Sequence, residues 1–151
     1  MTVHELLRRQ RLPPPPEEVF PFFGDARNLE AITPPWLGFR VITPDPIPMR
    51  VGTLIAYRLK LHGVAVSWLT SIQDWVDNER FVDQQVRGPY ALWHHTHTFA
   101  PDGRGGTVMS DHVRYALPLG PLGELAHRAV VRRDLDAIFA FRRDAVAARL
   151  A

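Results

Sequence analysis

Two runs of alternating residues, joined by a glycine-rich segment, most constrain how this chain can fold. Side chains alternate across a β-strand, so every second residue of such a run lies on the same face. The segment between the runs reads Pro-Asp-Gly-Arg-Gly-Gly over residues 101–106, a composition typical of a hairpin turn. The faces that would meet inside carry, in order, Trp93, His95, His97 and Phe99 from residues 88–99, and Met109, Asp111, Val113 and Tyr115 from residues 107–116. Buried polar side chains need hydrogen-bonding partners, so we expect the two histidines and the aspartate to bind one another or a ligand.

The composition is that of one globular domain spanning residues 1–151. Hydrophobic residues make up 46% of the chain, which is enough to form a core. The formal net charge is only +2 and acidic and basic residues are interleaved, so no nucleic-acid-binding surface is predicted. Because there is no cysteine, disulfides, thiol nucleophiles and thiolate metal sites are excluded. The start of the chain lacks the pattern of a signal peptide and no apolar run reaches transmembrane length, so we expect a soluble, cytoplasmic protein without stable membrane insertion.

Periodicity and turn residues predict the order of the elements. Beside the hairpin, strands are expected at residues 2–12, 39–43, 53–62, 66–75 and 80–88. Two short helices, at residues 17–23 and 26–32, are expected after the first strand, the first of them opened by prolines and glutamates. A long helix is expected after residues 118–123, ending near residue 150. Its apolar residues approximate a single stripe, formed by Leu122, Leu125, Ala129, Leu135, Ile138, Phe139, Ala145 and Val146.

This order predicts an α+β fold. Sequential strands with short turns form an antiparallel meander. A single amphipathic helix covers only one face of such a sheet, so about six or seven strands must curve around the C-terminal helix. We therefore expect a helix-grip fold with a cavity between the sheet and the long helix.

The chain also resembles a known superfamily through motifs spread over most of its length. They are Glu18-Val19-Phe20-x-Phe22-Phe23-x-Asp25-x-x-Asn28-Leu29, Thr33-Pro34-Pro35-Trp36-Leu37, Met49-x-x-Gly52-Thr53, Phe81-Val82-Asp83-Gln84-x-x-x-Gly88-Pro89-Tyr90, Trp93-x-His95-x-His97-x-Phe99 and Asp111-x-Val113-x-Tyr115-x-x-Pro118. On these motifs the chain resembles the START-like superfamily, also called SRPBCC, and within it the small bacterial proteins similar to polyketide cyclases, pollen allergens and coenzyme-Q-binding proteins. The resemblance implies a cavity for a hydrophobic ligand, but the fold alone does not give the function.

The polar residues of the hairpin allow three interpretations. Histidines at alternate positions on a strand, with a carboxylate across from them, are able to coordinate zinc or iron. They equally form a hydrogen-bonded His–Asp pair that fixes the hairpin register, or the polar end of a ligand pocket. We predict a ligand-binding role for His95, His97 and Asp111, with no resident metal and no cofactor.

Large side chains on the strands and the long helix are predicted to line the pocket. The aromatic candidates also fit ordinary core packing. In residues 80–88, alternation leaves two choices: Asp83, Gln85 and Arg87 face inward with Phe81, or Val82, Gln84 and Val86 do. In the first case Arg87 would orient a polar head. The remaining predicted ligand-binding residues are Trp68, Trp93, Phe99, Tyr115 and Phe139.

Two further features receive a structural interpretation. The final helix carries Arg128, Arg132, Arg133, Arg142, Arg143 and Arg149, but four acidic residues are mixed among them, so a solvated face with ion pairs is expected. Trp36, in the proline-rich loop, is expected to pack on the second short helix, or else to form a lid or a transient membrane contact.

The function predicted from the sequence is the binding or carrying of a small hydrophobic or lipid-like molecule. One alternative is a cyclase or dehydratase that uses His95 or His97 with Asp111 as acid–base groups. A second is a protein-interaction module that uses the Trp36 loop. No catalytic constellation is recognisable, so we rank binding first; the sequence predicts no particular oligomeric state.

Overall fold

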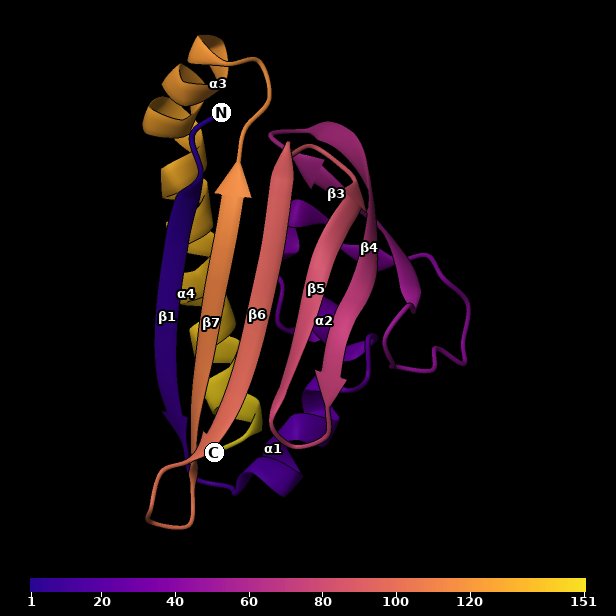
Figure 1. Cartoon of the computed structure of the whole chain (residues 1–151), viewed down its shortest axis with the longest axis vertical. Helices are drawn as coiled ribbons and strands as arrows, with labels where there is room; N and C mark the ends of the chain where they lie inside the picture. The colour runs from indigo at the N-terminus through magenta and orange to yellow at the C-terminus, as the bar shows by residue number, and fades with distance from the viewer.

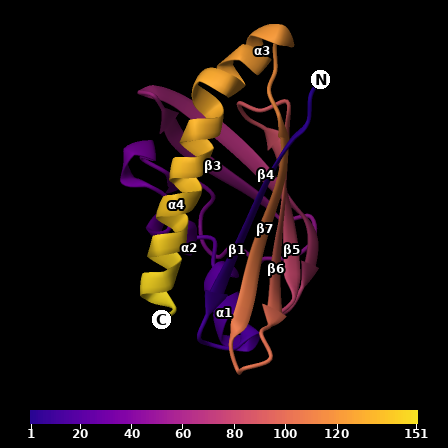
Figure 2. The same ribbon diagram turned by 90° about the vertical axis from the view of Figure 1, so that its left-hand side faces the viewer.

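The computed structural model describes residues 1–151 and contains one curved antiparallel sheet. The strands lie in the order β1-β7-β6-β5-β4-β3-β2, so β1 and β2 are the edges (Figure 1). The long C-terminal helical segment crosses one face of the sheet (Figure 2). The strands are β1 (His4–Leu12), β2 (Arg40–Val41), β3 (Leu54–Leu61), β4 (Val64–Val76), β5 (Arg80–Arg87), β6 (Leu92–Pro101) and β7 (Thr107–Ala116). The predicted helix-grip fold is confirmed.

The first helix begins where the chemistry of the sequence favours a helix. Helix α1 (Pro16–Phe23) has proline at its first position and glutamates at 17 and 18 in its first turn, where the helix dipole favours negative charge. Helix α2 (Asn28–Ala31) is a single turn, and a 3₁₀ turn follows at Pro35–Leu37. The C-terminal segment comprises α3 (Pro121–Ala126), a π-helical turn (His127–Val131) and α4 (Arg132–Arg149).

The predicted hairpin forms with the expected face inward. Strands β6 and β7 pair from Leu92–Ala116 to Pro101–Thr107. The Asp102 carboxylate accepts hydrogen bonds from the backbone N–H groups of Arg104 and Gly106, which closes the turn. Alternation then buries the predicted set of eight residues: Trp93, His95, His97, Phe99, Met109, Asp111, Val113 and Tyr115.

The core is divided along the sheet. At the α1 end, Phe20 packs edge-on against Phe81 and Phe99. Toward the other end, Trp93, Tyr115 and Phe139 belong to a second apolar cluster. Along β6 and β7, the histidines and Asp111 fall between the residues of these two clusters. A polar layer therefore separates two apolar parts of the interior.

Several expected elements are corrected by the structure. Strand β2 is only Arg40–Val41 rather than residues 39–43, because it pairs with β3 over those two residues alone. The final helix is interrupted by its π-helical turn, and the first part of its apolar stripe is not buried: Leu122 is 69% exposed and Leu125 is 58% exposed. The reason is that α3 extends past the ends of β1 and β7, where no strand lies beneath it (Figures 1 and 2). No helix is both long enough and apolar enough to span a membrane.

The junction of β7 and α3 depends on a glycine. A Cβ atom added to Gly123 would lie only 2.0 Å from the backbone oxygen of Pro118. Helix propensity alone favours alanine over glycine by about 1 kcal/mol, but we expect Gly123→Ala to lower the free energy of unfolding by about 1–3 kcal/mol because the backbone must shift. Urea denaturation measures this, with the exposed Ala126→Ser as the matched control. A Gly123→Ala protein that is more stable than the wild type would contradict the close approach.

Candidate functional site

Three neighbouring strands bring two carboxylates and two imidazoles to the inner face of the sheet. The register places Asp83 of β5 opposite His95 of β6, and His97 of β6 opposite Asp111 of β7. His95, His97 and Asp111 are at most 5% exposed. We call these four residues and Arg142 of α4 the polar cluster.

The hydrogen bonds of the polar cluster form two histidine–carboxylate pairs. His95 Nε2 lies 2.8 Å from Asp111 Oδ1, and His97 Nε2 lies 2.6 Å from Asp83 Oδ2. An ionised carboxylate only accepts, so each Nε2 donates. The two rings stack with centroids 3.6 Å apart, and Phe81 stacks on the far side of His97 at 4.0 Å.

Arg142 supplies the positive charge of the cluster from the helix side. Its Nη2 lies 3.4 Å from Asp111 Oδ1 and 3.4 Å from His97 Nδ1. Because a guanidinium only donates, His97 Nδ1 is the acceptor, which agrees with the proton on its Nε2. The Arg142 Nε is buried and has no hydrogen-bond partner, the one such side-chain atom in the protein.

Burial and charge set the protonation of the cluster. Burial raises the pKa of Asp111, but the charge of Arg142 and the hydrogen bond from His95 hold it below its usual range. Burial also raises the pKa of Asp83, but the hydrogen bond from His97 and the neighbouring His95 hold it below its usual range. Burial, followed by the neighbouring His95, lowers the pKa of His97 to about 4. At neutral pH the cluster therefore holds two carboxylates, one guanidinium and a neutral His97.

A cavity of about 170 Å³ lies between the sheet and α4, with the polar cluster at its wall. Asp83, His95, His97 and Arg142 line it. The rest of the lining is mostly apolar and includes Leu37, Tyr57, Leu59, Leu61, Trp68, Tyr90, Trp93, Leu135, Ile138 and Phe139. Burial raises the pKa of Tyr57 and of Tyr90, so both phenols stay neutral.

The structure brings five of the nine predicted site residues to this cavity. They are Trp68, Trp93, His95, His97 and Phe139. Asp111 does not line it, but it holds His95 from the β7 side.

The other three lie elsewhere. Phe99 packs in the apolar cluster beside α1, against Phe20 and Phe23. The Tyr115 hydroxyl is hydrogen-bonded to His127 Nε2 at 2.8 Å, and its ring belongs to the second apolar cluster. These two residues lie outside the cavity lining. Alternation specifies only the inner face of a strand, whereas the position along the strand decides whether a residue meets the cavity or the dry core.

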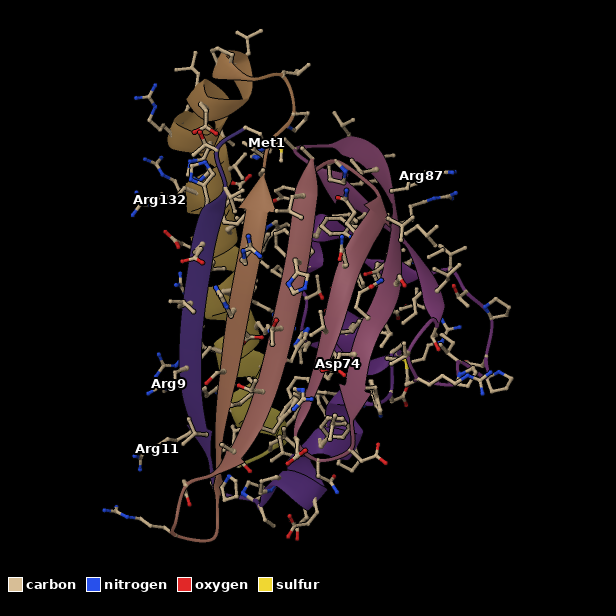
Figure 3. All side chains as sticks on the ribbon, viewed as in Figure 1. Met1, Arg9, Arg11, Asp74, Arg87 and Arg132 are labelled. Carbon is tan, nitrogen blue, oxygen red and sulfur yellow. The ribbon has the colours of Figure 1, made fainter.

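Arg87 requires a separate correction. It is exposed near the end of β5 and points away from the sheet (Figure 3). On β4, Leu69 pairs with Arg87, and the next residue, Thr70, pairs with Gln85. Strand β5 therefore has one extra residue between Gln85 and Arg87, which forms a bulge. A bulge breaks the two-residue alternation, and the inward face predicted from Phe81 and Asp83 does not extend to Arg87.

Arg142 is a site residue that was not predicted from the sequence. Its interpretation as part of a solvated face is wrong for this arginine, whose side chain is only 12% exposed. A signal was present, because position 142 follows Phe139 by three residues and precedes Val146 by four, which places it on the buried face of the helix. Asp83 was one of two alternative sets of inward residues on its strand and was not predicted as the partner of His97.

The Trp36 loop differs from expectation as well. Trp36 is 61% exposed and its ring meets Phe141 of α4 edge-on, with centroids 5.9 Å apart. It therefore packs on the long helix rather than on α2. It also lies outside the cavity lining.

Two groups of side chains offer metal-ligating atoms within 4.8 Å of one another: Asp83, His95 and His97, and separately His4, Glu124 and His127. In both groups the two imidazoles stack face to face at 3.6 Å. Metal ligation uses in-plane lone pairs that converge on the ion, whereas stacked rings direct theirs side by side. The geometry therefore fits hydrogen-bonded histidine–carboxylate pairs better than a metal centre.

Known structures share this architecture. A protein of Chromobacterium violaceum superposes with a TM-score of 0.74 and 20% identity, with 97% of each chain covered. The Zhui aromatase/cyclase of a Streptomyces species gives a TM-score of 0.68 and 11% identity, with 95% of this chain and 94% of that one covered. A START superfamily protein of Mycobacterium smegmatis superposes with a TM-score of 0.67 and 14% identity, with 97% of each chain covered. At these identities the likeness establishes the fold alone.

Sequence comparison supplies the family. No curated protein matches the chain in sequence. The family model described as polyketide cyclase / dehydrase and lipid transport matches residues 12–141. The helix-grip fold is the one that these structures share. The chain therefore belongs to the polyketide cyclase/dehydrase and lipid transport family.

Proposed function

We propose that this protein binds a small, largely apolar ring compound that carries one hydroxyl or enol oxygen. The observation that carries the proposal is the mostly apolar cavity with a buried, unpartnered Arg142 Nε among its lining residues. Most ligand sites combine an apolar wall with a few polar groups that fix orientation.

The size of the cavity sets the size of the ligand. A volume of about 170 Å³ lies below the range of about 300–1,000 Å³ common for drug-sized ligands. It fits a body of about two fused rings. Such a body, comparable to a tryptophan side chain, buries about 150–250 Å². At about 25 cal/mol per Å² this contributes about 4–6 kcal/mol before the cost of ordering the ligand.

The polar cluster sets the chemistry of the single oxygen. The Arg142 Nε–H requires an acceptor, since a buried donor left unpaired costs about 1–3 kcal/mol. Asp83 is partly accessible, with a side chain 20% exposed, and it accepts from His97 through Oδ2 alone. We propose that the ligand hydroxyl accepts from the Arg142 guanidinium and donates to Asp83, both of which line the cavity. A carboxylate ligand would instead face the ionised Asp83 and is expected to bind more weakly.

A set of matched probes tests the proposal. We expect 2-naphthol to bind the wild-type protein more tightly than naphthalene or 2-naphthoate in calorimetric titration. Arg142→Lys keeps the charge beside Asp111 but removes the Nε donor. This variant should lower the affinity for 2-naphthol about tenfold, since a hydrogen bond to a charged group contributes about 1.5–3 kcal/mol. Its affinity for naphthalene should stay within about threefold of the wild-type value.

Two controls accompany this experiment. Arg143→Lys changes an exposed arginine on the next position of α4 and should leave all three probes unaffected. Phe139→Trp fills the cavity and should lower the affinity for all three probes to the same extent. Equal affinity of Arg142→Lys and wild type for 2-naphthol would refute the role of the Nε donor, and the absence of binding by every probe would refute the cavity as the site.

Acid–base catalysis is a second candidate, favoured by the 2.6 Å pair of His97 and Asp83. A neutral imidazole oriented by a carboxylate is able to accept a proton from a bound substrate. A pKa of about 4, however, makes His97 a weak base, which is why we place binding first. The catalytic proposal predicts that His97→Ala abolishes turnover of a polyketide-like substrate while native mass spectrometry still detects the bound substrate.

A further inference from the structure

The start of the C-terminal helical segment presents uncovered leucines. Leu119 is 77% exposed, Leu122 is 69% exposed and Leu125 is 58% exposed. We call these three residues the α3 tip. Met1, 83% exposed, lies at the same end and borders the same surface hollow as Leu119 (Figure 3).

The position of the α3 tip explains its exposure. Helix α3 extends beyond the ends of β1 and β7, so the sheet cannot cover it (Figures 1 and 2). Leu122 and Leu125 nonetheless continue the apolar stripe whose later members, Leu135 and Phe139, are buried. Single exposed apolar residues are ordinary, but a contiguous group at one end of a molecule is typical of an interaction site.

The charges next to the α3 tip are positive and unpaired. Arg128, Arg132 and Arg133 follow on the same helical segment, all three are exposed, and none forms a salt bridge. The single acidic residue between positions 117 and 133 is Glu124, which is held by His4 at 3.1 Å. The surface behind the leucines is thus available to an anionic partner.

We propose that the α3 tip docks on the surface of an anionic lipid bilayer. With a rise of about 1.5 Å per residue, Arg128 lies about 5 Å beyond Leu125 along the helix, and Arg132 about 10 Å beyond it. Interfacial helices bury their apolar residues about 5–10 Å deep, at the boundary between headgroups and acyl chains. The leucines therefore reach that boundary while the arginines meet the lipid phosphates.

A bilayer fits the α3 tip better than a protein partner does. A stable protein interface buries about 800 Å² on each side and depletes charge from its centre. Three leucines and a terminal methionine are fewer than such an interface needs, and the adjoining arginines favour an extended negative surface. This proposal does not depend on the ligand assigned to the cavity.

Vesicle co-sedimentation tests the proposal. The wild-type protein is expected to bind phosphatidylcholine vesicles that contain phosphatidylglycerol, and to bind pure phosphatidylcholine vesicles much less. Leu122→Ser with Leu125→Ser should lower the partition coefficient about tenfold through the loss of buried apolar area. Arg128→Gln should lower it about fivefold, an effect that disappears at high salt.

The matched control is Leu7→Ser with Leu54→Ser, which changes two exposed leucines on the sheet and should bind vesicles like the wild type. Thermal unfolding by circular dichroism verifies that all variants fold. Failure of the wild type to bind anionic vesicles, or equal binding by the tip variant, would overturn the proposal. A wild-type dimer that the tip variant dissociates, seen by light scattering, would also overturn it and assign the α3 tip to a second copy of the chain.

Discussion

Replacing Asp111 with alanine is expected to lower the free energy of unfolding by about 3–5 kcal/mol. Asp111 is 5% exposed, and its carboxylate accepts from His95 and lies 3.4 Å from the Arg142 guanidinium. Breaking a buried ion pair by removing one partner leaves the other charge buried without compensation. Urea denaturation near neutral pH, followed by circular dichroism, measures the change.

Two comparisons make this result interpretable. Asp136→Ala removes an exposed carboxylate that is 2.7 Å from Arg8, and it should cost less than about 1 kcal/mol. Asp111→Asn keeps an acceptor for His95 but loses the charge, so an intermediate cost is expected. If Asp111→Ala costs no more than Asp136→Ala, the polar cluster does not stabilise the fold as we describe.

Stability is expected to fall by about 2 kcal/mol between about pH 7 and pH 5 because of His97 alone. The pKa of His97 is lowered from 6.5 to about 4, first by burial and then by the neighbouring His95. Below about pH 6.5 the unfolded chain binds a proton at this residue that the folded chain rejects, so acidification favours unfolding until about pH 4. The low pKa values of Asp83 and Asp111 act in the same direction, but only below the ordinary carboxyl range near pH 4.

The variant His97→Gln isolates this contribution. It retains a donor for Asp83 but cannot titrate, so its unfolding free energy should depend on pH less steeply than that of the wild type, by about 2 kcal/mol over the same interval. Burial also lowers the pKa of His127, which leaves some pH dependence in the variant. Substitution of the exposed His112 by asparagine is the control. An unchanged slope in His97→Gln would show that the pKa of this imidazole is the same in the folded and unfolded protein, contrary to the lowered value.

The sequence predicted the hairpin and its inward residues because they depend on local rules. A glycine-rich turn joins two strands, and period-two alternation then assigns every side chain of β6 and β7 to a face. The same logic placed Trp93, His95 and His97 on the inner face, and all three line the cavity. Motifs spread over most of the chain identified the superfamily, which the family match confirms.

Local rules of this kind do not predict where a strand departs from regular alternation or where a helix extends past the sheet. The bulge that turns Arg87 outward inserts one residue in β5, and nothing in the alternation of residues 80–88 marks it. The exposure of Leu122 and Leu125 likewise follows from where the sheet ends, not from the helical stripe they share with Phe139.

By itself, the sequence determined which residues of β6 and β7 lie on the inner face and that a single helix must cover the curved sheet. Only the tertiary structure decided which of those residues meet one another. Arg142 reaches Asp111 across 31 positions of sequence. His97 is hydrogen-bonded diagonally to Asp83 on β5 rather than to Asp111, the residue opposite it on β7. The physical reason is that faces follow from the local geometry of the backbone, whereas register, strand ends and the position of α4 are set by the packing of the whole core.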